Sequence, residues 1–172
     1  LAHTALPPAM IETATAIGDW LIVLPILLSL LGAAFLMVLR RQRGAPVIGA
    51  VLVIGGVIAT DVGLLLRILA DGPLSMTMGR WLPPFGISLT ADLFSAGFAL
   101  AAAVVTLVVV LYAEMGREAE KGRDGFHSMV LLLLAGVSGA FLTGDLFNLY
   151  VWFEVMLIAS FGLIVLGGTP LQ

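Results

Sequence analysis

The chain has 172 residues, of which 60% are hydrophobic and 11% charged, and its mean hydropathy is +1.14. An apolar share this far above that of soluble domains excludes an ordinary globular enzyme, and the length leaves little room for a separate soluble domain. The absence of cysteine excludes disulfides, thiolate metal sites and cysteine nucleophiles.

Apolar runs of membrane length predict an all-α membrane protein with about five transmembrane helices. Residues 1–18 hold two prolines, lack Lys and Arg, and predict an external tail without a secretory signal. The transmembrane portion is then 19–172, with Asp19 capping the first span and Pro25 in that span's second turn. The expected spans are 20–39, 47–70, 93–113, 126–143 and 146–166.

Two connections on the same side of the membrane have distinct signatures. Residues 71–90 hold two short alternating runs separated by turn residues, which predicts a short hairpin outside the bilayer core. Asp145 follows a tight turn and is expected to cap the fifth helix. On the fourth span, Gly136, Ala140 and Gly144 predict a face that a neighbouring helix can approach closely.

Basic residues orient the chain. Six of the eight Lys and Arg residues fall within 40–43 and 117–123. The positive-inside rule makes both loops cytoplasmic, which leaves the N-terminus, the hairpin and the 143–145 turn outside. These clusters are too short to indicate nucleic-acid binding, and they lie where membrane orientation requires them.

The fifth apolar run carries one carboxylate, Glu154, at a depth that needs an explanation. If the helix begins near Gly144, Glu154 lies roughly 15 Å along it, about half of a ~30 Å hydrocarbon core. A charge at that depth costs about 2.5 kcal/mol or more, which makes the acid a candidate proton relay. The alternative is a permanently protonated Glu that only hydrogen-bonds another helix.

Two further titratable residues are weaker candidates for the same relay. Asp61 lies within the second span, and Arg67 is about 240° around the helix from it, so the two are not expected to pair. Asp61 serves either a proton or cation path or a structural polar contact. His127, at the cytoplasmic end of the fourth span, is either part of a proton entry route or merely solvated.

No cofactor or metal is expected. We interpret the aromatic residues around Trp152 as interfacial or packing groups, and Met76 and Met78 as packing residues. His3 and His127 are the only histidines, and their spacing is not that of metal ligands.

Two stretches of the chain resemble a known family. They are Gly79-Arg-Trp-Leu-Pro-Pro-Phe-Gly-Ile-Ser-Leu-Thr-Ala-Asp92 and Gly144-Asp-Leu-Phe-Asn-Leu-Tyr-Val-Trp-Phe-Glu-Val-Met-Leu-Ile-Ala-Ser160. Their order, spacing and flanking spans resemble the D subunit of Mrp-type multisubunit cation/proton antiporters, within the wider family of antiporter-like subunits of respiratory complex I and membrane-bound hydrogenases. The second stretch favours the D subunit over its relatives.

The resemblance implies that Glu154 matches the family's essential fifth-helix glutamate, which works with a lysine on a later, broken helix. The one lysine here, Lys121, lies in a loop, so the sequence corresponds to an N-terminal portion of such a subunit. The resemblance further implies a secondary transporter subunit, not an enzyme, in a bacterial plasma membrane. Its partners would be other membrane subunits, protons and a monovalent cation, expected to be Na⁺.

Two alternatives remain open at this point. One is the equivalent subunit of a redox-driven proton pump, and the other is a membrane scaffold that translocates nothing.

Overall fold

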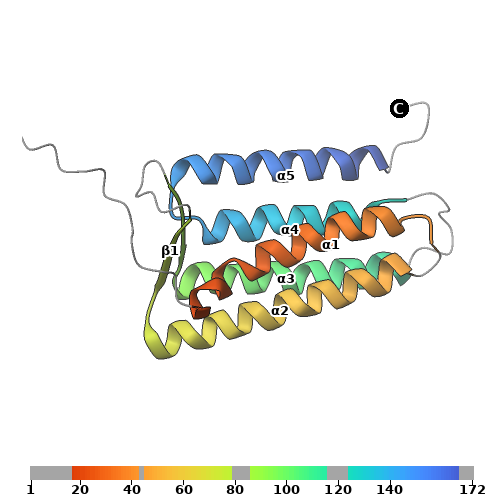
Figure 1. The fold of residues 1–172 in the computed structure, drawn as a ribbon. Helices are drawn as coiled ribbons and strands as arrows, with labels where there is room; N and C mark the ends of the chain where they lie inside the picture. The colour runs from red at the N-terminus through yellow and green to blue at the C-terminus, as the bar shows by residue number, and fades with distance from the viewer. Residues whose placement is uncertain (1–16, 43–44, 79–85, 116–123, 167–172) are drawn as a thin grey trace, which may run out of the picture.

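The computed structural model describes residues 17–42, 45–78, 86–115 and 124–166, which form a bundle of α-helices with a two-stranded hairpin at one end (Figure 1). The elements in chain order are η1 (Ile17–Ile22), α1 (Leu24–Leu39), α2 (Ala45–Asp71), β1 (Leu74–Met78), β2 (Ile87–Ala91), α3 (Leu93–Met115), α4 (Phe126–Leu142) and α5 (Leu146–Leu166). The expected all-α fold with a hairpin between the second and third helices is confirmed.

Among the described residues, α2, α3 and α5 are long and apolar enough to cross a membrane. Helices α1 and α4 are equally apolar but shorter, with 16 and 17 residues. At about 1.5 Å per residue they span roughly 24–26 Å, somewhat less than a ~30 Å hydrocarbon core. The 3₁₀ segment η1 lengthens α1 toward the hairpin end.

Helix α4 is the central element of the bundle. It contacts α1, α2, α3 and α5, and α5 packs mainly against α4 on the outside of the bundle (Figure 1). The hairpin and the α4–α5 turn lie at one end, whereas the end of α1 and the start of α2 lie at the other (Figure 1). This arrangement leaves most of the surface of α5 uncovered by the described residues.

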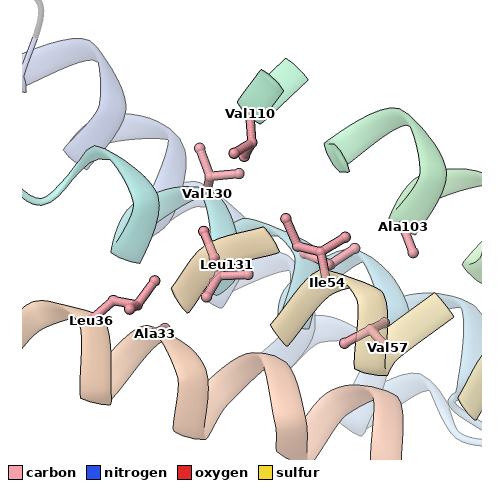
Figure 2. Close-up of a cluster of buried hydrophobic side chains, with 10 residues drawn as sticks. Ala33, Leu36, Ile54, Val57, Ala103, Val110, Val130 and Leu131 are labelled. Atoms are coloured by element: carbon pink, nitrogen blue, oxygen red, sulfur yellow. The ribbon is translucent and has the colours of Figure 1, made fainter. Parts of the chain in front are cut away.

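Hydrophobic side chains from the helices and the hairpin form two buried clusters in the described part of the chain. The loop-side core contains residues from α1, α2, α3 and α4, namely Ala33, Leu36, Ala50, Ile54, Val57, Ala103, Val110, Val130, Leu131 and Leu134 (Figure 2). The hairpin-side core contains Ile22, Ile26, Leu64, Ile68, Met76, Leu89, Ala91, Ala96 and Leu142. The hairpin therefore closes one end of the bundle with its own apolar side chains, and Met76 packs there as expected.

The start of the first helix differs from the expectation. Helix α1 begins at Leu24, after η1, and its N-cap residue Val23 makes no side-chain capping bond. Pro25 therefore falls in the first turn, where its missing N–H has no intrahelical partner to lose. The predicted cap by Asp19 is wrong, because the Asp19 carboxylate pairs with Arg67 of α2 at 3.1 Å.

The close approach of α4 and α5 depends on glycines one turn apart. The backbone of Gly136 lies against Met156, and that of Gly139 lies against the indole ring of Trp152. The expected face had Gly136 with Ala140 and Gly144; Gly136 meets α5 as expected, and Gly139 meets it as well. Gly144 instead packs against the side chains of Ser88 and Thr90 on β2.

Candidate functional site: acidic side chains of the helical bundle

Glu154 lies on the side of α5 that faces away from α4. Trp152 and Met156 contact α4, and Glu154 is two residues from each, about 200° around the helix. It is half-buried and follows the first residue of α5 by eight positions, roughly 12 Å along the axis. The Tyr150 side chain, one turn earlier on α5, interacts with it. The carboxylate therefore lies near the middle of α5 and faces the outside of the bundle.

Asp61 occupies the opposite kind of environment. It lies on the inward face of α2 with 0% of its surface exposed, between the buried residues Val57 and Leu64. Neither carboxylate oxygen has a hydrogen-bond partner among the described residues. Arg67 does not reach it and instead contacts Asp19 at 3.1 Å and Asp71 at 3.7 Å. The expectation that Asp61 and Arg67 do not pair is therefore confirmed.

The structure does not bring Glu154 and Asp61 together. Asp61 is enclosed within the bundle formed by α1 to α4, whereas Glu154 lies on the side of α5 that faces away from α4. The two acids are therefore separate features of the fold, and one does not supply the other with a hydrogen-bond partner.

His127 is buried at the start of α4, with 3% exposed, so the interpretation of a merely solvated side chain is wrong. Its Nε2 lies 3.1 Å from Oε1 of Glu114, near the end of α3. The sequence offered one signal for this pair: an acid and a histidine that flank the same interhelical connection. The pair joins the loop ends of α3 and α4.

The two stretches that carry the family resemblance meet at the hairpin end. The strands of the hairpin are antiparallel, with Met76 opposite Leu89, and β2 also bridges to Thr143 in the α4–α5 turn. Ser88 donates its backbone N–H to Asp145 Oδ2 at 3.0 Å and accepts the Gly144 N–H at 2.8 Å. The segment before α3 is thereby bound to the start of the helix that carries Glu154.

Asp145 performs the capping role expected of it. Its Oδ1 accepts the Asn148 N–H at 2.7 Å, which satisfies one of the free donors at the start of α5. Burial raises the pKa of Asp145, but the hydrogen bonds from Asn148 and Ser88 outweigh it, so the net pKa lies below the ordinary aspartate value. The charged carboxylate thus holds both α5 and β2.

Replacing Asp145 with Ala is expected to destabilise the protein by about 1–2 kcal/mol, since capping losses alone reach that size. Because the folded pKa is depressed, the stabilisation is present at neutral pH and is lost as the pH falls through the folded pKa. Asp145→Asn should retain part of the cap but flatten the decline of stability in acid. Thermal unfolding of the detergent-solubilised protein at several pH values measures both effects.

The matched control is Asp92, which caps α3 through the Ser95 N–H at 2.7 Å and whose carboxylate accepts no bond from the hairpin or the α4–α5 turn among the described residues. Asp92→Ala should cost less than Asp145→Ala. Equal losses would mean that the Asp145–Ser88 bond adds nothing to the cap.

Among the described residues, no group of three or more His, Asp and Glu side chains is placed to hold a metal ion. The three expected relay residues, Glu154, Asp61 and His127, lie at three separate places in the bundle. Ser29 and Ser138 are two polar residues that the sequence did not single out, and both are fully buried.

Comparison with known proteins places these features in context. No protein-family model matches the chain. The D subunit of the Na⁺/H⁺ antiporter of Alkalihalophilus pseudofirmus is 40% identical over 152 residues, covering 88% of this chain and 31% of that protein. The D subunit of a probable K⁺/H⁺ antiporter of Rhizobium meliloti is 40% identical over 161 residues, covering 90% of this chain and 29% of that protein.

Solved structures of large membrane complexes contain the same fold. A chain of the Mrp complex from Dietzia sp. matches with a TM-score of 0.75 and 30% identity, over 87% of this chain and 28% of that one. A chain of an archaeal membrane-bound sulfane sulfur reductase matches with a TM-score of 0.76 and 29% identity, over 89% of this chain and 31% of that one.

The chain thus spans about a third of the length of these relatives. It is a multi-pass membrane protein, as its apolar helices and its relatives indicate. The resemblance noted in the sequence is confirmed: this chain is a homologue of the N-terminal portion of the D subunit of Mrp-type antiporters.

Proposed function

We propose that this chain is the N-terminal part of a proton-translocating subunit of a multisubunit Na⁺/H⁺ antiporter, with Glu154 as the proton carrier. The position of Glu154 on α5 supports the proposal most directly. An acid that exchanges protons needs a partner whose approach changes its proton affinity, since a nearby cation favours the charged form and an apolar surrounding disfavours it. The outer face of α5 is open to such a partner from other helices or subunits.

The choice of Na⁺ rests on the names of relatives. The protein from A. pseudofirmus is named for Na⁺ and the one from R. meliloti for K⁺, and the two are equally identical to this chain. Among the described residues, the bundle offers no cluster of acids that would select between these ions. The cation path is therefore assigned to other parts of the assembled complex, while this chain carries the proton.

Membrane vesicles containing the complete complex test the proposal. A proton gradient is imposed, and the fluorescence of a pH-sensitive dye reports its collapse when Na⁺, K⁺ or choline is added. Na⁺ should dissipate the gradient in vesicles with this subunit and leave it intact in vesicles from cells that lack it. Equal dissipation in both vesicle types would refute the assignment.

The redox-driven alternative is supported by the similarity to the archaeal respiratory complex. In that case proton movement follows the addition of an electron donor and does not require Na⁺. Measuring dye response to each trigger separately therefore distinguishes the two functions. If the chain is only a scaffold, replacing Glu154 should leave the dye response to Na⁺ and to the electron donor unchanged.

We also propose that the chain lies in a bacterial plasma membrane, with the hairpin end outside and the end bearing Arg40 and Arg41 in the cytoplasm. His127 and Glu114 would then lie near the cytoplasmic surface and form part of a proton entry route. Asp61 lies inside the bundle, Glu154 lies on the outer face of α5, and His127 lies at the loop end of α4, so a route that joins them needs bound water or groups from other subunits.

A further inference from the structure

The outward face of α1 carries an apolar stripe that ends at an arginine. Leu31, Ala34 and Val38 follow one another at the three- and four-residue spacing of one helix face, and the next step of three residues reaches Arg41. Leu31 is 59% exposed, Val38 is 81% exposed, and Phe35 beside them is 61% exposed. The stripe is therefore left uncovered by the described residues.

A shallow hollow lies where the stripe ends. Ala34, Met37 and Val38 supply its apolar lining, and Arg40 and Arg41 line it as well. Arg40 turns back along the helix, and its Nη1 lies 3.8 Å from Met37 Sδ, which keeps the guanidinium group at the hollow. The hollow thus joins an apolar surface to two cationic groups.

Neither arginine forms an ion pair with an acid among the described residues. The ion pairs in that part of the chain involve Arg67 and His127 instead. Arg40 and Arg41 are both exposed. A guanidinium group matches the oxygens of a phosphate with two parallel hydrogen bonds, which makes arginine the usual residue for phosphate recognition. The positive charge at the hollow is therefore available to an anion.

The length of α1 brings these arginines close to the depth of lipid phosphates. The helix has 16 residues, roughly 24 Å, which is less than a ~30 Å hydrocarbon core. A short span draws its flanking cations toward the headgroups, while their aliphatic stems stay on apolar surface. From Arg41 back to Leu31 the stripe extends over roughly 15 Å, about the depth of one leaflet.

We propose that the outward face of α1 binds an anionic phospholipid, with its phosphate at Arg40 and Arg41 and an acyl chain along the stripe toward Leu31. A zwitterionic lipid offers the same chains but no net charge for the two cations. Free phosphate offers no chain for the stripe. A helix of another subunit would have to supply acids to both arginines within an otherwise apolar contact. The site goes beyond the proposed role of Glu154 and does not depend on it.

Photo-crosslinking of the assembled complex in lipid nanodiscs tests the site. Phosphatidylglycerol and phosphatidylcholine with the same photoreactive acyl chain are compared, and peptide mass spectrometry locates the adducts. Phosphatidylglycerol should label residues 31–38 roughly fivefold more than phosphatidylcholine, the effect of one arginine at an anionic membrane surface. The exposed Val105 and Val108 are the matched control, because α3 contains no Lys or Arg and both probes should label it equally.

Substitutions and a competitor identify what the lipid recognises. Replacing both arginines, Arg40→Gln with Arg41→Gln, should lower the phosphatidylglycerol adducts on α1 to the phosphatidylcholine level. Gln42→Ala, at the same end of the helix, should leave the adducts unchanged. Excess inorganic phosphate should displace the lipid no more than a chloride salt of equal ionic strength does, because phosphate cannot occupy the stripe.

Three results would overturn the proposal. Equal labelling of α1 by both probes means that the arginines select no lipid. A lack of adducts on α1, while the probes label other helices of the complex, means that another subunit covers this face. Displacement by phosphate beyond the salt effect means that the hollow binds the free anion. Should the double variant fail to insert, the comparison of the two probes on the unaltered chain still decides. Since no transport rate is read, the outcome is independent of the antiport assay.

Discussion

Replacing Glu154 with Gln is expected to reduce Na⁺-dependent proton transport by roughly 100-fold or more, the range that a positioned acid-base group contributes. Gln has nearly the same shape and can still interact with Tyr150, but it cannot take up or release a proton. The loss should appear in the initial rate of dye recovery after Na⁺ addition to vesicles. The amount of assembled complex, measured on a native gel, should stay at the wild-type level.

Two further variants distinguish the effect of the acidic group from the effects of its position and of its neighbour Tyr150. Glu154→Asp keeps a carboxylate but draws it back by one methylene, so a partial rate is expected. Tyr150→Phe removes the hydroxyl that interacts with Glu154 and keeps the acid, so its effect should be smaller than that of Glu154→Gln. A Glu154→Gln complex that assembles normally and transports at the wild-type rate would leave only the scaffold interpretation.

The helices and the hairpin were predictable because their signals are local. Runs of apolar residues fix the number of helices, and turn residues around 71–90 separate two short alternating runs. Asp145 was recognisable as a cap because a capping residue acts on the backbone three positions later. Such features depend on neighbours within one helical turn, which a sequence displays directly.

The errors arose where distant residues compete. Asp19 lies where a capping residue is expected, but it binds Arg67, 48 residues later in the chain, and α1 begins only at Leu24. Gly144 was expected on the face of α4 that a neighbouring helix approaches, but it packs against Ser88 and Thr90 of the distant hairpin.

The sequence predicts which residues are candidates for the site, but it does not predict which way their side chains face in the bundle. Glu154 stands out because it is a lone acid in an apolar run, yet α5 is apolar around its whole circumference, so no pattern indicates which face meets α4. Ser29 and Ser138 gave no signal at all, since single serines are common in membrane helices. Both are fully buried without a hydrogen-bond partner among the described residues, which only the fold reveals.

Replacing Gly139 with Ala is expected to weaken the docking of α5 on α4 by about 1–3 kcal/mol, the usual cost of overpacking a close-packed contact. A Cβ at this position would overlap the indole ring of Trp152, which is rigid and cannot fold back as a flexible side chain would. Relief of the clash requires α5 to move outward, which displaces Glu154 on the same helix. We therefore expect both a lower unfolding temperature in detergent and a slower Na⁺-dependent transport rate.

Gly97 on α3 is the matched control, because a Cβ there would meet no atom within 4 Å among the described residues. Gly97→Ala should be neutral or slightly stabilising, since Ala is the better helix former by about 1 kcal/mol. Combining Gly139→Ala with Trp152→Leu should recover part of the lost stability, because the smaller side chain makes room for the added methyl group. If Gly139→Ala leaves the unfolding temperature and the transport rate as unchanged as Gly97→Ala does, the space between α4 and α5 admits an extra methyl group. The contact between Gly139 and Trp152 then does not control the position of Glu154.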